Sequence, residues 1–391
     1  MGNPRPDVIL GAPSQSYDST YWPRYPFGDK PAAIGAGVTV TTSVPAGSAS
    51  GGETFSDGDD YELDGVNFGT NVPATNQAFF GGVNGPIEQA ANGADIKAGS
   101  GLLPSGWTYP GSTPQLVSSA RAYSGTKSIL NRFGYDVATG GVYDSGNFQY
   151  GIQFDFGAPY RSLYTNACFY FDPAGYTSGQ VKFQRFVGAA GGGIQDSDYP
   201  NVLFNQYGFP AFQRASSTGD LGNISPGGNI WVWNGWVRQE VFFVPGTSGG
   251  TDGSVQWRVT RLSDGVVIAA GNRNGLRFWA GADPAFRYWV IQGYIGNEFG
   301  RDGVQLTIDR DVFAIANLAS SAFPRFTVIG DASTYSACDK SRLSVAPFTS
   351  WSNTRIGLKI NKGAHANLIA KHLYVMQGLN SPLNENGSLL A

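Results

Sequence analysis

The chain has 391 residues and is rich in glycine, with 55, and in proline, with 22. Only 14 % of the residues are charged, against roughly 25 % in an average globular protein. Hydrophobic residues make up 41 % and aromatic residues 14 %, which is enough for a large core and argues against disorder. The formal net charge of −3 excludes a basic nucleic-acid-binding protein by composition, and no apolar run reaches the roughly 20 residues of a membrane span.

Residues 1–60 are predicted to form an extended anchoring arm. Prolines recur through its first half, and proline fixes φ and removes a hydrogen-bond donor. Aromatic side chains such as Trp22 indicate that the arm packs against the protein's own core or against a partner. A short strand is expected at residues 38–42. Residues 61–113 are rich in Gly, Ala, Ser and Asn and are predicted to be a loop-rich connecting segment, with a short helix starting at Ile87.

From residue 114 onward the pattern changes to short runs in which apolar and polar side chains alternate. Such runs cover residues 148–156, 181–187, 237–244, 255–260 and 288–295. Many short strands separated by glycine-rich turns predict an all-β fold, a jelly-roll β-sandwich over residues 114–320. Residues 321–391 are predicted to form a separate small β-module with a loose tail.

Four motifs in the middle region resemble the concanavalin A-like jelly roll of polysaccharide lyases and lectins. They are ARAYSGTKSIL (120–130), FYFDPAGYTSGQVKFQRFVGAAGGG (169–193), NGWVRQEVFFVPGTSGGTDGSVQWRV (234–259), and YWVIQGYIGNEFG (288–300) followed by LTIDRDVFAIA (306–316). Their order along the chain carries the resemblance. FTSWSNTRIGLKINKG (348–363) and HLYVMQG (372–378) resemble small immunoglobulin-like modules of bacterial surface and phage proteins.

The resemblance implies that a ligand would bind on the concave face of one sheet. Sugars are held by aromatic rings and by planar hydrogen-bonding groups. The polar positions of the alternating strands supply candidate glycan-binding residues: Lys182, Gln184, Arg185, Arg238, Glu240, Gln256, Arg258, Tyr288, Gln292 and Tyr294. The same alternation also fits the ordinary solvated face of a half-buried sheet.

A lyase needs a base, an acid and a group that holds the uronate carboxylate, and Tyr294, Arg185 and Gln292 could supply them. The two histidines, His365 and His372, both lie in the C-terminal unit. The family's clustered Arg and Gln-x-His strand motifs are absent, which argues against lyase activity. The two closely spaced carboxylates of a glycosidase of this fold are absent as well.

The acidic run SDGDDYELDG (56–65) is a candidate calcium site, with Asp57, Asp59 and Asp60 as ligands. Calcium takes six to eight oxygen ligands, and alternate acidic side chains in a glycine-containing loop can provide several of them. The spacing does not match an EF-hand loop. A solvated acidic turn is the alternative.

The N-terminus shows no basic start followed by the apolar run of about 7–15 residues that marks a secretory signal. Cys168 and Cys338 are the only cysteines and give neither a disulfide framework nor a metal spacing. A charge-poor, aromatic β protein without these features is expected to be made in a host cytoplasm and to work in a virion. The main prediction is therefore a structural virion protein of a tailed bacteriophage, acting as a capsid decoration, head fibre or tail fibre.

In that role the arm would bind other virion proteins, and the chain would form a homo-oligomer such as a trimer. The jelly roll would offer a face for a host-surface glycan. No nucleic acid is expected as a partner, and calcium is the only cofactor for which the sequence offers candidate ligands. The alternatives are a polysaccharide lyase and a non-catalytic carbohydrate-binding protein. Because the sequence offers few candidate catalytic residues, a role without enzymatic activity is favoured.

Overall fold

The computed structural model describes residues 39–45, 55–97, 99–109, 115–132, 135–136, 141–142, 151–172, 180–188, 201–207, 209–224, 234–295, 305–379 and 381–390. Within these ranges the only helical elements are one α-helical turn, α1 (Pro86–Gln89), and one 3-10 turn, η2 (Ala74–Asn76). No helix in the described part of the chain is long and apolar enough to cross a bilayer. Most of the predicted arm lies outside the described residues.

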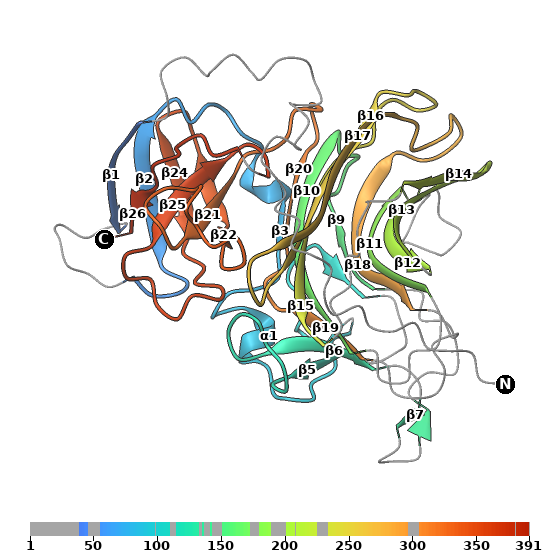
Figure 1. Cartoon of the computed structure of the whole chain (residues 1–391), viewed down its shortest axis with the longest axis horizontal. Coiled ribbons are helices and arrows are strands. Elements are labelled where there is room, and N and C mark those ends of the chain that lie inside the picture. The colour runs from blue at the N-terminus through green and yellow to red at the C-terminus, as the bar shows by residue number, and fades with distance from the viewer. Residues whose placement is uncertain are drawn as a thin grey trace.

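The largest sheet has nine strands (Figure 1). They are β3 (Gln77–Phe79), β5 (Gln115–Ser118), β6 (Ser128–Arg132), β10 (Ser162–Asp172), β15 (Trp236–Val244), β16 (Gly253–Arg261), β17 (Val267–Leu276), β19 (Gln305–Asp309) and β20 (Phe313–Asn317). The long strand β10 is central: β15 pairs with one of its edges, while β20 and β19 pair with successive halves of the other. Residues 310–312 link these two halves.

The second sheet has seven strands: β4 (Trp107–Thr108), β9 (Ile152–Asp155), β11 (Gln180–Gly188), β12 (Asn201–Tyr207), β13 (Phe209–Ser216), β14 (Gly219–Ile224) and β18 (Phe286–Ile295). Phe169, Phe186, Phe243, Trp257 and Trp289 belong to the core that the two sheets enclose. Burial of these large rings is the main driving force for the face-to-face packing. The predicted all-β jelly-roll sandwich is confirmed. A separate short pair joins β7 (Tyr135–Asp136) to β8 (Gly141–Val142).

A smaller sandwich lies beside the large one. One of its sheets contains β1 (Thr39–Pro45), β2 (Asp60–Val66), β23 (Phe348–Trp351) and β24 (Arg355–Lys359), and the other contains β21 (Phe326–Gly330), β22 (Ser344–Ala346), β25 (His372–Met376) and β26 (Ser388–Leu389). Strand β2 pairs with β24, so blue N-terminal strands lie among the red C-terminal strands in Figure 1. The segment predicted to be a connection thus begins with a strand of this sandwich.

The smaller sandwich packs against the nine-stranded sheet and shares an apolar cluster with it. Tyr164 of β10, Phe242 of β15 and Phe313 of β20 belong to the same buried cluster as Phe326 and Val328 of β21. One face of the nine-stranded sheet therefore encloses the main core, and much of its other face is covered by the smaller sandwich. This arrangement decides which predicted site residues can meet a ligand.

Candidate functional site

The seven-stranded sheet has one face in the main core and one face turned away from it. Phe186 of β11 and Trp289 of β18 are cross-strand partners, and both lie in the main core. Successive side chains of a strand point to opposite faces, so Arg185 and Val187 point away from that core. Val187 packs there with Tyr288 in a separate small apolar cluster. We call this surface the outer face of the seven-stranded sheet.

A β-bulge in β11 brings Lys182 onto the same face. The pairing register shifts between Lys182 and Gln184, and both Phe183 and Gln184 are buried toward the main core. A bulge places one extra residue in the strand, so the residues that flank the buried pair, Lys182 and Arg185, share a face. Lys182 is half-buried, whereas Arg185 is only 1 % exposed.

Lys182, Arg185 and Gln153 share the outer face of the seven-stranded sheet. Arg185 of β11 and Gln153 of β9 both pair with Val290 of β18, so they lie in one row across three strands. Gln153 is 4 % exposed. They contribute a guanidinium, an amide and an ammonium group as hydrogen-bond donors, and the apolar cluster next to them lowers the local dielectric.

An ion pair lies at the edge of the same face. Arg287 binds Asp155 through two contacts, Nε to Oδ1 at 2.5 Å and Nη2 to Oδ2 at 2.6 Å. Burial of Asp155 favours its neutral form, but hydrogen bonds from Arg287, from the Gly157 amide and from Tyr288 outweigh burial and hold the pKa of this carboxyl below its usual value. Asp155 is thus an ionised acceptor that fixes the Tyr288 side chain.

Gln292 and Tyr294 lie on β18, on the strand that carries Tyr288 and Val290. The backbone register pairs Tyr294 with Lys182. The side chains of Gln292 and Tyr294 lie outside the described residues.

Gln184 takes part in a buried polar network inside the main core. Its Oε1 accepts hydrogen bonds from Thr165 Oγ1 at 2.8 Å and from Trp289 Nε1 at 3.1 Å, and its Nε2 donates to Gln239 Oε1 at 3.3 Å. Gln184 is 0 % exposed and links the two sheets of the large sandwich. Its hydrogen-bonding capacity is used within the protein, which is the usual state of a buried amide.

Arg238, Glu240 and Arg258 lie on the nine-stranded sheet, on the face covered by the smaller sandwich. They are 5 %, 4 % and 2 % exposed. Arg258 Nε lies 2.7 Å from Glu240 Oε2, and its Nη1 donates to the carbonyl of Leu379 at 2.8 Å. Arg238 donates to the carbonyl of Lys340 at 2.8 Å. The three predicted glycan-binding residues thus join the two sandwiches.

A cavity beside these three residues has a volume of about 10 Å³. That is the space of about one water molecule and is too small for a sugar ring. Gln256, on the same strand as Arg258, is half-buried and pairs with Phe242 of the neighbouring strand. The predicted glycan-binding set is therefore split among the outer face of the seven-stranded sheet, the main core and the contact between the sandwiches.

The candidate calcium ligands have separate protein partners. Asp57 Oδ1 accepts from the Lys362 amide at 2.8 Å, Asp59 Oδ2 accepts from the Ser56 amide at 2.7 Å, and Asp60 Oδ2 pairs with Lys359 Nζ at 2.7 Å. Among the described residues no three His, Cys, Asp or Glu side chains gather where they could hold a metal ion. Calcium binding by this turn stays a prediction from sequence.

Gln153 is the member of the outer face that the sequence-based set left out. It occupies a polar position of the alternating run 148–156, and that alternation was the signal for it. The pattern could not show that β9 lies beside β18, because this pairing joins residues far apart in the chain.

No protein-family model matches the chain, and no curated protein matches it by sequence. Solved structures do show similarity. A marine alginate lyase from Aplysia kurodai is 13 % identical, with a TM-score of 0.36 and coverage of 51 % of this chain and 87 % of that one. The endo-β-1,4-glucuronan lyase from the fungus Trichoderma reesei is 14 % identical, with a TM-score of 0.37 and coverage of 58 % and 95 %.

The lectin UEA-II, complexed with galactose, is 12 % identical, with a TM-score of 0.31 and coverage of 58 % of this chain and 98 % of the lectin. Lyases and a lectin thus occur among the similar structures. Likeness at this level does not extend to an activity, because one fold hosts many functions.

Proposed function

We propose that the chain is a carbohydrate-binding protein whose ligand contacts the outer face of the seven-stranded sheet near Lys182 and Arg185. The observation that carries the proposal is the gathering of Lys182, Arg185 and Gln153 on one face of neighbouring strands, away from the main core. Lys182 is half-buried and forms the accessible end of this group, so the ligand meets it before Arg185.

The chemistry of these groups favours a glycan that carries carboxylates. Ammonium and guanidinium groups donate charge-assisted hydrogen bonds, which are about twice as strong as neutral ones. Arg185 lies beside the apolar pair Val187 and Val290, where an interaction with an anion is screened less than in water.

Affinity electrophoresis on gels that contain acidic or neutral polysaccharides tests this proposal. The wild-type protein should be retarded by an acidic polysaccharide, and Lys182→Ala should weaken binding at least about tenfold, the loss of one charged hydrogen bond of roughly 1.5–3 kcal/mol. Lys359→Ala is the matched control, because it removes the same charge from an exposed position on the smaller sandwich. Equal retardation of all three proteins would argue against the outer face as the site.

Lyase activity at the same face is the second candidate, and the register that places Tyr294 opposite Lys182 favours it. A phenol and an ammonium group are chemically able to move the proton beside a uronate carboxylate. Incubation with acidic polysaccharides, followed by the absorbance of the unsaturated product, distinguishes cleavage from binding. Tyr294→Phe should abolish the absorbance and preserve retardation in gels if the chain is a lyase.

The tailed-bacteriophage virion role, the immunoglobulin-like relationship of the smaller sandwich and the homo-oligomeric state rest on the sequence alone and stay predictions. A glycan-binding face is compatible with attachment of a virion to a host surface. Sedimentation of the purified full chain would test the expected oligomer directly.

A further inference from the structure

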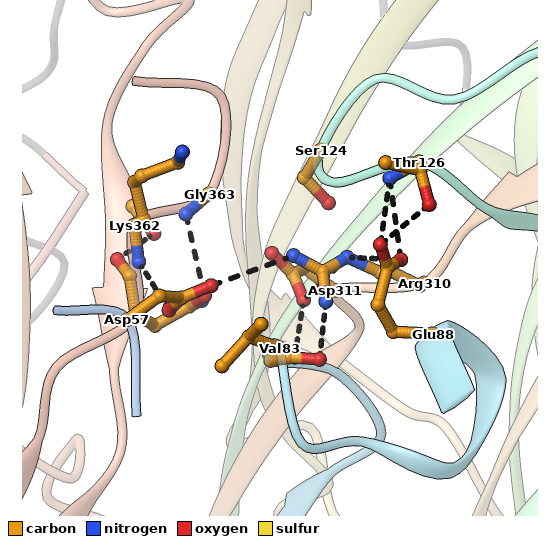
Figure 2. A network of polar contacts seen from close by, with 12 residues as sticks. Asp57, Val83, Glu88, Ser124, Thr126, Arg310, Asp311, Lys362 and Gly363 are labelled. Carbon is orange, nitrogen blue, oxygen red and sulfur yellow. Dashed lines mark hydrogen bonds and ion pairs between the residues drawn. The ribbon is translucent and has the colours of Figure 1, made fainter. Parts of the chain in front are cut away.

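Arg310 is the centre of a buried group of charged side chains where the two sandwiches meet. It lies in the link between β19 and β20 and is 2 % exposed. Its guanidinium nitrogens lie 3.7 Å from Asp57 Oδ2, 3.5 Å from Glu88 Oε2 and 3.9 Å from Asp311 Oδ1. Figure 2 shows Arg310 between Asp57 on one side and Glu88 on the other. We call these residues, together with Asp309, the Arg310 junction.

The Arg310 junction connects three parts of the fold. Asp57 belongs to the smaller sandwich, because the Lys362 amide donates to its carboxylate at 2.8 Å and the amide of its neighbour Gly58 donates to the Ile360 carbonyl at 2.8 Å. Glu88 comes from α1 and accepts from Thr126 Oγ1 at 2.6 Å. Arg310 itself lies in the link between two strands of the nine-stranded sheet and also donates to the Gly82 carbonyl.

Negative charge exceeds positive charge in this junction. The carboxyl groups of Asp57, Glu88 and Asp311 lie 3.5–3.9 Å from one guanidinium, and the carboxyl of Asp309, the preceding residue, is also affected by its charge. Lys362 also acts on Asp57, and Arg238 of β15 lines the same small cavity as Asp309. Repulsion among buried carboxylates is costly in a low dielectric, so one of them is driven to bind a proton.

Asp309 is the carboxyl that the geometry selects. It is 1 % exposed, and it accepts from the Ser124 amide at 3.0 Å and from Ser124 Oγ at 2.7 Å. Burial and the charge of Asp311 raise the pKa of Asp309 to about 6. Burial also raises the pKa values of Tyr123 and Cys168, which flank this side of the junction, to about 12, so both stay neutral and cannot compensate a charge.

We propose that the Arg310 junction is an acid-strengthened latch between the two sandwiches, in which Asp309 takes up a proton as the medium acidifies and the contact tightens. A group that binds a proton more tightly when folded contributes stability at low pH and loses it as the pH rises through its folded-state pKa. For Asp309 that window ends near pH 6. The latch is therefore tighter at mildly acidic pH than at pH 8.

Thermal unfolding of the full chain between about pH 5 and pH 8 tests the latch. The melting temperature of the wild type should include a contribution from Asp309 that decreases as the pH rises. In Asp309→Asn this decrease should be absent, because asparagine retains an acceptor for Ser124 and carries no charge at any pH. Asp264→Asn is the matched control, since Asp264 lies in an exposed ion pair with Arg261 and should leave the decrease unchanged. A pH profile of Asp309→Asn that parallels the wild type would overturn the proposal.

Hydrogen exchange of the wild-type protein is a second test, and it does not require that a variant folds. After correction for the intrinsic effect of pH, the amides of Lys362 and Thr126, which bond to the Asp57 and Glu88 carboxylates, should lose protection as the pH rises from about 4.5 to about 6.5. The amide of Trp257 in the main core should not change over this range. Equal changes at all three amides, or none at Lys362 and Thr126, would contradict a local latch.

Discussion

Tyr164 of the large sandwich lies flat on Phe326 of the smaller one, with ring centroids 4.1 Å apart and an interplanar angle of 15°. Both residues are almost completely buried. The smaller sandwich is therefore held by apolar contact as well as by charged groups, and the two sandwiches are expected to unfold together.

Replacement of Phe326 by alanine should weaken this contact strongly. Truncation of a buried phenylalanine costs about 3–5 kcal/mol of unfolding free energy, because apolar contacts are lost and a cavity remains. Urea unfolding followed by tryptophan fluorescence measures the loss. Ile369→Ala, at a position that is 67 % exposed, is the control and should change the free energy by less than about 0.5 kcal/mol. A similar small change in Phe326→Ala would show that the contact is absent in solution.

The ion pair of Arg258 with Glu240 gives a second prediction. Glu240→Gln keeps an acceptor for the Tyr164 hydroxyl, which donates to Glu240 Oε1 at 3.0 Å, but leaves the Arg258 charge without its counter-ion. This change should cost about 3–5 kcal/mol of unfolding free energy. The double change Glu240→Leu with Arg258→Met should recover most of the loss, because the Arg258 charge is removed together with its counter-ion. Denaturant unfolding of the single and double variants decides between these outcomes.

Because His365 is buried, the free energy of unfolding is expected to fall in acid. It is 3 % exposed, its Nε2 lies 3.4 Å from the Ile329 carbonyl oxygen, and its buried Nδ1 has no hydrogen-bond partner among the described residues. Burial lowers the pKa of His365 below its usual value. The unfolded chain then binds the proton more tightly, so stability is present above about pH 6.5 and falls as the pH drops below it.

The measurement is the difference in unfolding free energy between wild type and His365→Gln at several pH values. This difference should shrink steadily as the pH falls from about 7.5 to 5.5, because only the wild type carries the penalty for protonation. Because both proteins contain Asp309, the opposite pH effect expected for that residue cancels in this difference. A difference that is constant over this range would mean that His365 is accessible to solvent.

Gly271 is required by a close approach of strand β17 to the core. A Cβ atom at this position would lie 2.1 Å from a ring atom of Trp257, which is 0 % exposed. Gly271→Ala should therefore destabilise the fold by about 1–3 kcal/mol through overpacking. Gly281→Ala is the control, because a Cβ there meets nothing within 4 Å. Thermal unfolding of both variants compares the two sites.

The strands of the large sandwich could be predicted from alternation, whereas the surroundings of each polar face could not. The pattern of β15 correctly separates Val237 and Val241 from Arg238 and Glu240. The polar pair nevertheless lies under the smaller sandwich, because the residues that cover it come from a distant part of the chain. The alternation of apolar and polar residues shows that a strand has two different faces, but it does not show which part of the protein packs against each face.

A local irregularity in β11 also limited how much of the candidate site could be predicted from the sequence. Gln184 and Lys182 are two positions apart and were expected on the same face, as an unbroken strand requires. The bulge between them sends Gln184 into the main core and leaves Lys182 on the outer face of the seven-stranded sheet. Bulges depend on the pairing partner on each side, so single-strand periodicity does not reveal them.

The pairing of β2 with β24 has a consequence for biosynthesis. Asp64 and Arg355, which bond across these strands, are 291 positions apart. A ribosome that makes about 5–20 residues per second therefore leaves β2 without its neighbour for roughly 15–60 s. During that delay β2 exposes an open edge that can recruit foreign strands, so helper proteins that shield nascent chains should raise the yield of correctly assembled product.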